Sequence, residues 1–244
     1  MRRRFFVEEF EADSATLRGE AAHHLGRVLR AEPGQLYELS DGRHLWLART
    51  EDVSRDEICF ALVEQLAAPA PTVQIALLLA IVKFDRFEWA LEKATELGAD
   101  EIRPLIADRS EHGLVAAAGK RAERWKRILA ESAQQSRRLR VPALNDATKP
   151  REAFSASTAP IKALLSERPA ARPLRDLLGP AASARPDGNP ARVVIAIGPE
   201  GGWTEAEFNL ATSSGFAEAS LGTNILRTET AVCAALAAAQ YAFA

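Results

Sequence analysis

Cysteine and histidine are scarce in this chain of 244 residues, and neither is spaced as metal ligands are. The two cysteines, Cys59 and Cys233, form no CxxC pair, and the four histidines form no HExxH motif. The sequence therefore predicts neither a disulfide framework nor a metal site. Two unpaired cysteines are typical of a reducing compartment, so we expect a cytoplasmic protein.

An excess of one charge and a long apolar run are also missing. Thirty-one Lys and Arg stand against 33 Asp and Glu, so any surface that binds nucleic acid must be local. Phe5 and Phe6 are followed by Glu8 and Glu9, which predicts no signal peptide. The longest apolar stretch, residues 231–244, is interrupted only by Gln240 and is too short to cross a bilayer. We expect no membrane segment, and we expect this stretch to be a helix that its own core and a second subunit cover.

What is present is an ordinary globular composition, 47% apolar and 26% charged. A Pro/Ala segment at residues 67–71 separates two patterns. Before it, short apolar segments at 5–10, 36–39, 45–48 and 58–63 alternate with turn residues, and one helix is expected at 20–29. The sequence predicts a small β-rich domain over residues 1–68.

After this segment, strands alternate with helices. Apolar runs predict strands at 75–82, 102–106, 161–165, 193–197 and 217–221. Helices are expected at 85–97, 120–138, 174–178, 204–212 and 228–243, with Gly98 ending the first, and a loop at 185–190. This alternation predicts an α/β domain with a mostly parallel sheet over residues 71–244.

Ligands of such sheets bind beyond the carboxyl ends of the strands. The run Gly198-Pro199-Glu200-Gly201-Gly202 follows one strand, and Thr204 or Glu205 is placed to stabilise the N-terminus of the next helix. The run is neither a P-loop nor GxGxxG, which disfavours a phosphate cradle. Its glycines permit close approach of a ligand to the backbone, although a tight turn would also explain them.

Two further strand ends carry polar residues. Leu221-Gly222-Thr223-Asn224-Ile225-Leu226-Arg227 leads directly into Thr228-Glu229-Thr230. Thr228 as the N-cap and Glu229 in the first helical turn are a structural explanation that leaves Arg227 unexplained. The third strand end is Leu165-Ser166-Glu167-Arg168.

Together these motifs resemble the RsmE family of ribosomal RNA methyltransferases. The resemblance rests on residues 197–202, 221–222 and 225–231, and it extends through Asp85-Arg86, residues 92–98, Arg109-Ser110 and Gln135-Ser136 to the N-terminus. Gln134 and Arg137 stand where the family has Glu and Gly, and Thr223-Asn224 replaces Pro-Arg. The resemblance implies S-adenosylmethionine-dependent methylation of uridine N3 in small-subunit (16S) ribosomal RNA. It also implies the SPOUT fold, an α/β domain with a C-terminal trefoil knot.

The resemblance further implies the site. The cofactor, S-adenosylmethionine, would be held by Leu165, Ile197, Gly198, Pro199, Glu200, Gly201, Gly202, Leu221, Gly222, Ile225 and Leu226. Arg227 would stabilise negative charge on uracil, and Glu229 would accept the N3 proton or orient Arg227.

The small N-terminal domain resembles the PUA-like module that this family uses to hold RNA. Its candidate phosphate contacts are Arg2, Arg4, Arg27 and Arg30, joined by Arg124 and Arg138 from a basic stretch at 120–140. A solvated helix face is the other explanation of that stretch. The implied partners are small-subunit ribosomal RNA within the assembled subunit and a second copy of the chain that contacts the C-terminal helix.

Two other functions stay open at this point. One is a SPOUT methyltransferase that acts on another RNA atom, such as a ribose 2′-hydroxyl. The other is a non-catalytic RNA-binding factor of ribosome assembly. The latter needs no tight cofactor pocket, so cofactor binding distinguishes it.

Overall fold

A computed structural model describes residues 3–68, 70–183 and 189–244, which form two compact units. The N-terminal unit comprises the described residues up to Ala70 together with Ala133–Val141. The C-terminal unit comprises Pro71–Ser132 and the described residues from Pro142 to Ala244. The sequence did not predict that Ala133–Val141 belongs with the first unit.

The N-terminal unit is built on a five-stranded sheet in the order β1-β3-β4-β5-β2. Its strands are β1 (Arg4–Phe6), β2 (Ser14–Arg18), β3 (Leu36–Ser40), β4 (Leu45–Val53) and β5 (Glu57–Leu66). Neighbouring strands are antiparallel except β1 and β3. Phe5, Leu25, Leu39 and Phe60 lie in its buried core.

Two expectations for this unit were wrong in detail. The first strand ends at Phe6, before the acidic residues Glu8 and Glu9, and β2 was not predicted because its sequence SATLR carries little apolar signal. The expected helix at 20–29 is a short α1 (Gly19–His23) followed by a π-helical turn, His24–Val28. Single π turns occur often at functional sites.

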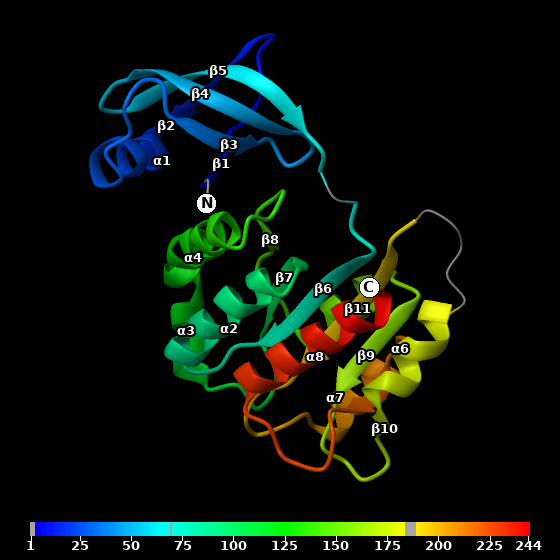
Figure 1. The fold of residues 1–244 in the computed structure, drawn as a ribbon. Coiled ribbons are helices and arrows are strands. Elements are labelled where there is room, and N and C mark those ends of the chain that lie inside the picture. The colour runs from blue at the N-terminus through cyan, green and yellow to red at the C-terminus, as the bar shows by residue number, and fades with distance from the viewer. Residues whose placement is uncertain (1–2, 69, 184–188) are drawn as a thin grey trace. The chain divides into compact units, whose positions relative to one another are not determined.

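The C-terminal unit contains a seven-stranded parallel sheet, which confirms the predicted α/β class. The order is β10-β12-β9-β11-β6-β7-β8. The strands are β6 (Val73–Ala80), β7 (Ala99–Leu105), β8 (Ala143–Leu144), β9 (Ile161–Leu165), β10 (Arg172–Pro173), β11 (Ala191–Ile197) and β12 (Ala217–Ser220). Figure 1 shows β6, β9 and β11 side by side at its centre.

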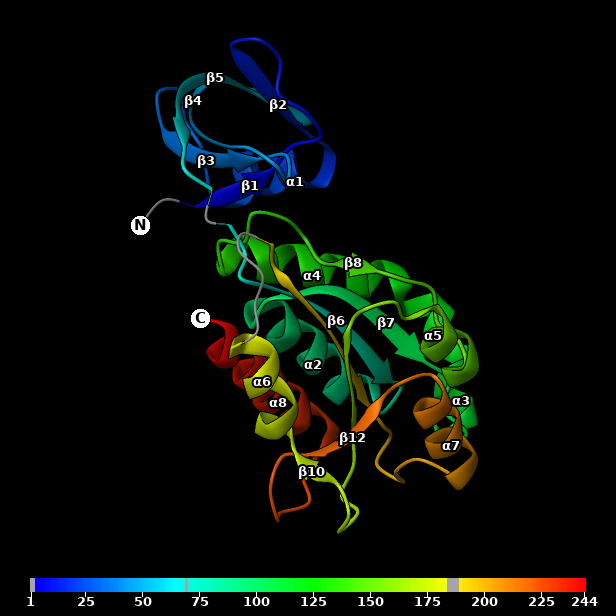
Figure 2. The ribbon, with the colours of Figure 1, turned by 90° about the vertical axis from the view of Figure 1, so that its right-hand side faces the viewer.

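Helices cover both faces of this sheet. They are α2 (Phe84–Glu96), α3 (His112–Ala118), α4 (Ala122–Gln135), α5 (Pro150–Ala156), α6 (Leu174–Ser183), α7 (Glu205–Ser213) and α8 (Thr228–Phe243). A 3-10 turn, Gly119–Arg121, joins α3 to α4. Figure 2 shows α2, α6 and α8 on one face and α5 and α7 on the other. Helices α3 and α5 were not predicted, and the central residues of the loop expected at 185–190 lie outside the described part of the chain.

Strand β6 shows why the apolar runs form the centre of the sheet. Because side chains alternate between faces, Leu78 and Ala80 join the cluster with Phe154 and Trp203, while Leu77 and Leu79 are fully buried on the other side. A strand buried on both faces has to be apolar throughout.

Helix ends follow the local sequence in two places. Gly98 adopts φ +90° directly after α2, as expected of a residue that ends a helix. Of the two candidates for the start of α7, Thr204 is the N-cap, and it forms a capping box with Glu207 that was not predicted. The N-cap of α8 was predicted wrongly. Arg227 occupies that position, and Thr228 is the first helical residue.

Candidate functional site

Three loops enclose a cavity of about 680 Å³ in the C-terminal unit. They follow β9, β11 and β12, whose carboxyl ends meet at one edge of the sheet because the strands are parallel (Figure 1). This volume lies in the range typical of small-molecule sites. The three strand ends that carry the glycine-rich and polar motifs of the sequence are therefore adjacent in the fold.

Most of the predicted site residues line this cavity. Every cofactor candidate except Gly201 does so, namely Leu165, Ile197, Gly198, Pro199, Glu200, Gly202, Leu221, Gly222, Ile225 and Leu226. Arg227 also lines it. Glu229 is not among the lining residues, although its neighbour Thr228 is.

Several lining residues were not predicted. They are Arg86, Ser166, Glu167, Arg168, Pro169, Trp203, Phe208, Asn224, Thr228 and Ala231. Residues 166–168 carried a weak signal, since they follow a strand. Arg86 belonged to the family resemblance, but nothing in the sequence placed it at this cavity, because only the fold brings α2 beside these loops.

The glycine loop after β11 is packed tightly against Trp203. A Cβ at Gly198 would lie 3.0 Å from Cε2 and 3.1 Å from Nε1 of this indole. The indole is 5% exposed, and its Nε1 donates to the carbonyl oxygen of Leu165 at 3.0 Å. Trp203 thus joins the loop after β11 to the end of β9, and any side chain at position 198 would require the indole or the loop to shift.

The loop after β12 leaves its main chain available. In the described ranges, no protein group forms a hydrogen bond with the backbone of residues 222–226. Gly222 has φ +127°, a conformation that favours glycine, and Ile225 is 79% exposed. Free amides and carbonyls beside apolar side chains are suited to a flat heterocycle.

Two arginines contact the glycine loop, and one of them, Arg86, also lines the cavity. Arg109 donates through Nη1 to the carbonyl oxygen of Gly201 at 2.7 Å. Arg86 forms an ion pair through Nη1 with Oε1 of Glu200. Arg86 also approaches Glu229, with 4.0 Å between its Nε and Oε1 of that carboxylate.

Glu229 has an unusual environment in the first turn of α8. Its side chain is 14% exposed, and Oε2 is buried without a hydrogen-bond partner among the described residues. Buried polar atoms without partners are rare and call for an explanation, of which a catalytic role is one.

Arg227 stands at the N-cap of α8 with its side chain exposed at the cavity. No carboxylate in the described part of the chain pairs with it. Thr228, the next residue, is buried and donates through Oγ1 to the carbonyl oxygen of Gly198 at 3.3 Å. This bond ties the start of α8 to the glycine loop.

The far wall of the cavity contains a charged cluster around Arg168. Its guanidinium carbon lies 4.4 Å from the ring centre of Phe208, and Nη1 donates to Glu205 at 3.4 Å. Ser166 donates to Glu218 at 2.6 Å. These contacts fix the loop after β9.

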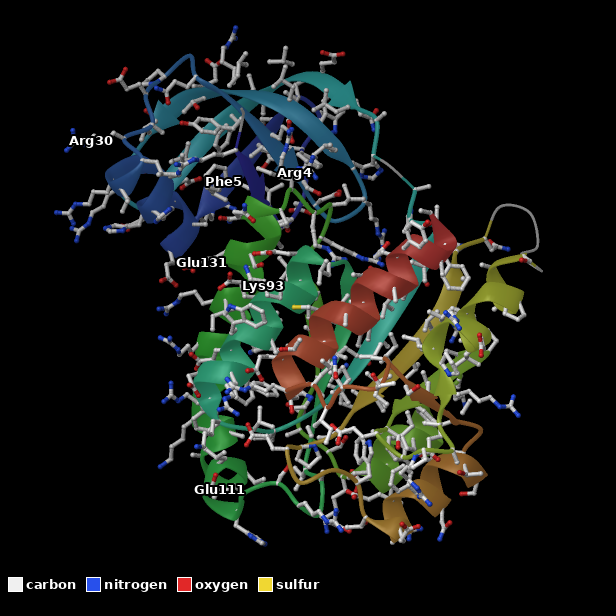
Figure 3. All side chains as sticks on the ribbon, turned by 60° about the horizontal axis from the view of Figure 1, so that its bottom comes forward. Arg4, Phe5, Arg30, Lys93, Glu111 and Glu131 are labelled. Carbon is white, nitrogen blue, oxygen red and sulfur yellow. The ribbon has the colours of Figure 1, made fainter. Side chains whose placement is uncertain are left out.

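The predicted RNA contacts lie in varied environments. Arg27 and Arg30 are exposed in the N-terminal unit, where Arg30 reaches into solvent (Figure 3). Arg124 is exposed on α4 and donates through Nε to Glu88 at 2.8 Å. Arg138 is half-buried, and Arg2 lies outside the described residues.

The prediction that Arg4 contacts RNA phosphate is wrong. It is 7% exposed and donates to Glu38 at 2.8 Å through Nη2 and 3.1 Å through Nε. Its Nη1 donates to the carbonyl oxygen of Arg137. A guanidinium enclosed in this way takes no part in phosphate contact, so Arg4 is a structural residue of the N-terminal unit.

Metal sites and membrane-spanning helices are absent from the described residues. Across the described ranges, no group of three or more His, Cys, Asp or Glu side chains is placed to hold a metal ion. No described helix is long and apolar enough to cross a membrane.

Comparisons with known proteins identify the family of this chain. The RNA methyltransferase domain family matches residues 68–240. Ribosomal RNA small subunit methyltransferase E of Synechocystis sp. is 34% identical, over 94% of this chain and 74% of its own length. The protein of the same name from Bacillus subtilis is 31% identical, over 98% of this chain and 96% of its own length.

A solved structure shares the whole fold. It is ribosomal RNA small subunit methyltransferase E from Neisseria gonorrhoeae, bound to S-adenosyl methionine. It matches with a TM-score of 0.84 and 31% identity, and the match covers 99% of this chain and 98% of that one.

Proposed function

This chain belongs to the RNA methyltransferase family that includes ribosomal RNA small subunit methyltransferase E, and from this we propose its reaction. The chain transfers the methyl group of S-adenosylmethionine to N3 of a uridine in small-subunit (16S) ribosomal RNA. The cavity between the loops after β9, β11 and β12 is the observation that carries the proposal.

The residues of the cavity fit this cofactor. S-adenosylmethionine has an adenine and a sulfonium but no phosphate, and the site has no P-loop. The free backbone of residues 222–226 suits the edge of adenine, with Leu221, Ile225 and Leu226 as apolar walls. We place the methionine end beside Gly198 and Gly202, where the absence of a Cβ allows close approach.

When bound, S-adenosylmethionine supplies an electrophilic methyl group on a positively charged sulfur. The residues of this chain then have to position uracil and take up its N3 proton. Positioning of the two reactants is a large part of the catalysis of such displacements.

Arg227 and Glu229 are the proposed catalytic residues. Arg227 has no ion-pair partner in the described residues, so its donors are available to a uracil carbonyl oxygen that gains negative charge. Oε2 of Glu229 lacks a donor, and the N3–H of uracil would supply one before the proton moves to the carboxylate.

We assign RNA binding to the N-terminal unit as a PUA-like module. Arg27 and Arg30 are its exposed candidates, and Arg124 and Arg138 add positive charge from α4 and the segment after it. Because the target is a ribosomal RNA, we expect the substrate of the whole protein to be the assembled small subunit in the cytoplasm.

We also propose a homodimer through α8 and a trefoil knot in the C-terminal unit. Exposed aromatic side chains support the dimer. Tyr241 of α8 is 88% exposed, and Trp89 of the neighbouring α2 is 43% exposed. Large exposed aromatic side chains of this kind are enriched at protein interfaces.

The test is methyl transfer from labelled S-adenosylmethionine to small subunits that lack this modification. The RNA is digested and the labelled nucleoside is identified. We expect N3-methyluridine at one position, and we expect free RNA to be the poorer substrate. Label on a ribose 2′-oxygen would contradict the target atom. If calorimetry detected no binding of S-adenosylmethionine, this would contradict the proposal that the chain is a methyltransferase and would favour a non-catalytic assembly factor.

A further inference from the structure

One guanidinium connects two carboxylates from separate elements of the C-terminal unit. Arg86 lies in the first turn of α2, Glu200 in the loop after β11, and Glu229 in the first turn of α8. Arg86 and Glu200 line the cavity, and Glu229 follows the lining residue Thr228 in the chain. The three residues therefore join the cofactor loop to the proposed proton acceptor.

The guanidinium uses different edges for the two contacts. Its Nη1 faces Oε1 of Glu200, and its Nε faces Oε1 of Glu229. Arginine presents five N–H donors in a rigid plane, so one such group can hold two carboxylates at a set separation. A lysine, as a point charge, has no such geometry.

Glu229 and Arg86 approach each other through Oε1 and Nε, which lie 4.0 Å apart, and Oε2 of Glu229 is buried with no hydrogen-bond partner among the described residues. At this distance the contact is an ion pair and not a hydrogen bond, so Arg86 acts on the carboxylate by electrostatic attraction. The acceptor capacity of Oε2 is unused within the described residues.

Burial makes this arrangement sensitive to Arg86. The side chain of Glu229 is 14% exposed, that of Arg86 27% and that of Glu200 46%. Removing the partner of a largely buried charge leaves the charge uncompensated, and the side chain then moves or takes up a proton. Either change would remove an oriented acceptor from the site.

We propose that Arg86 is a positioning residue that couples cofactor binding to proton acceptance. It holds Glu200, and with it the loop from Gly198 to Gly202, in the arrangement that receives the cofactor. It simultaneously orients Glu229 toward N3 of uracil. This inference rests on the proposed function, and Arg86 itself acts through the two carboxylates.

The first experiment is a double-mutant cycle on the methyl-transfer rate in single turnovers with saturating S-adenosylmethionine. We expect R86Q to slow transfer about 10²-fold, as misplacement of a reacting group by about 1 Å can do. We expect E229Q to be at least as slow. Because Arg86 acts through Glu229, R86Q/E229Q should be within about twofold of E229Q.

The second experiment measures S-adenosylmethionine binding by calorimetry, which needs no RNA and no turnover. R86Q and E200Q should each weaken binding by about three- to tenfold. The double variant R86Q/E200Q should bind no more weakly than the weaker of the two single variants. E229Q should bind the cofactor within about twofold of the unmodified protein. Because E200Q leaves Arg86 in place, the effect of E200Q on cofactor binding still tests the Arg86–Glu200 contact if R86Q folds poorly.

Arg175→Gln is the matched control. Arg175 lies at the start of α6, its side chain is 86% exposed, and it pairs with the adjacent Asp176. We expect R175Q to retain both the rate and the affinity. Its melting temperature shows what the loss of one surface arginine does to stability.

The outcomes distinguish a failure of the proposed function from a failure of the positioning role of Arg86. An unmodified protein that makes no N3-methyluridine contradicts the proposed function, while the binding cycle still tests the Arg86–Glu200 coupling. Unchanged transfer in R86Q contradicts the inference alone. So do effects of R86Q and E229Q that multiply in the double variant, because two independent roles would then be present.

Discussion

Adding a single methyl group at Gly198 should damage both stability and cofactor binding. In Gly198→Ala the new Cβ would lie 3.0–3.2 Å from three atoms of the Trp203 indole. Carbon atoms in favourable contact lie about 3.5–4.0 Å apart, so the ring or the loop has to move by about 0.5 Å. The ring is buried and held by its hydrogen bond to Leu165, and therefore cannot rotate away freely.

Overpacking of this kind costs about 1–3 kcal/mol of unfolding free energy. In a protein of this size each kcal/mol lowers the melting temperature by about 2–4 °C. Gly198 and Trp203 both line the cavity, so the shift also changes the cofactor site. We expect the Kd for S-adenosylmethionine to rise about tenfold, which corresponds to about 1.4 kcal/mol.

Gly113→Ala is the control for the same chemical change. Gly113 lies in α3, and a Cβ there would meet no heavy atom within 4 Å. Alanine should therefore stabilise the helix by about 0.5–1 kcal/mol and leave binding unchanged. Thermal unfolding and calorimetry measure both variants. The reasoning is refuted if Gly198→Ala melts and binds as the unmodified protein does.

Two predictions concern the N-terminal unit. Arg137 has φ +56° and pairs with Glu38, which is 5% exposed. Both Arg137→Gly and Arg137→Ala lose the ion pair with Glu38, but only glycine is suited to this backbone conformation. Urea unfolding should therefore show the alanine variant to be about 1 kcal/mol less stable than the glycine variant. Equal stability would show that the backbone conformation is not strained. At Asp41, burial acts to raise the pKa, but hydrogen bonds from His44 and from the backbone of Arg43 outweigh it and lower the pKa below its ordinary value. The stabilisation is thus present above the unfolded-state pKa and is lost as pH falls through the folded-state pKa. Asp41→Ala should be less stable at pH 7, with the difference narrowing below about pH 4; a difference independent of pH in urea titrations would contradict this.

Local sequence explains much of the fold of the C-terminal unit. The apolar run that becomes β6 has no alternation because the strand is covered on both faces, and the sequence alone reveals this. The motif after β11 could likewise be placed at a strand end, and Thr204 at a helix start. Strand β2 escaped prediction because pairing with β5, and not an apolar run, stabilises it as a strand.

The sequence by itself therefore determined the parallel α/β class and the three strand-end loops, since both depend on local patterns and on the shared edge of parallel strands, and the family resemblance supplied the cofactor candidates within those loops. Only the tertiary structure decided which charges meet. Arg4 was predicted as a phosphate contact and is buried against Glu38, while Arg86, to which the sequence assigned no partner, contacts Glu200 and Glu229. Ion pairs between residues far apart in the chain depend on how helices and strands pack, and no periodicity in the sequence records that packing.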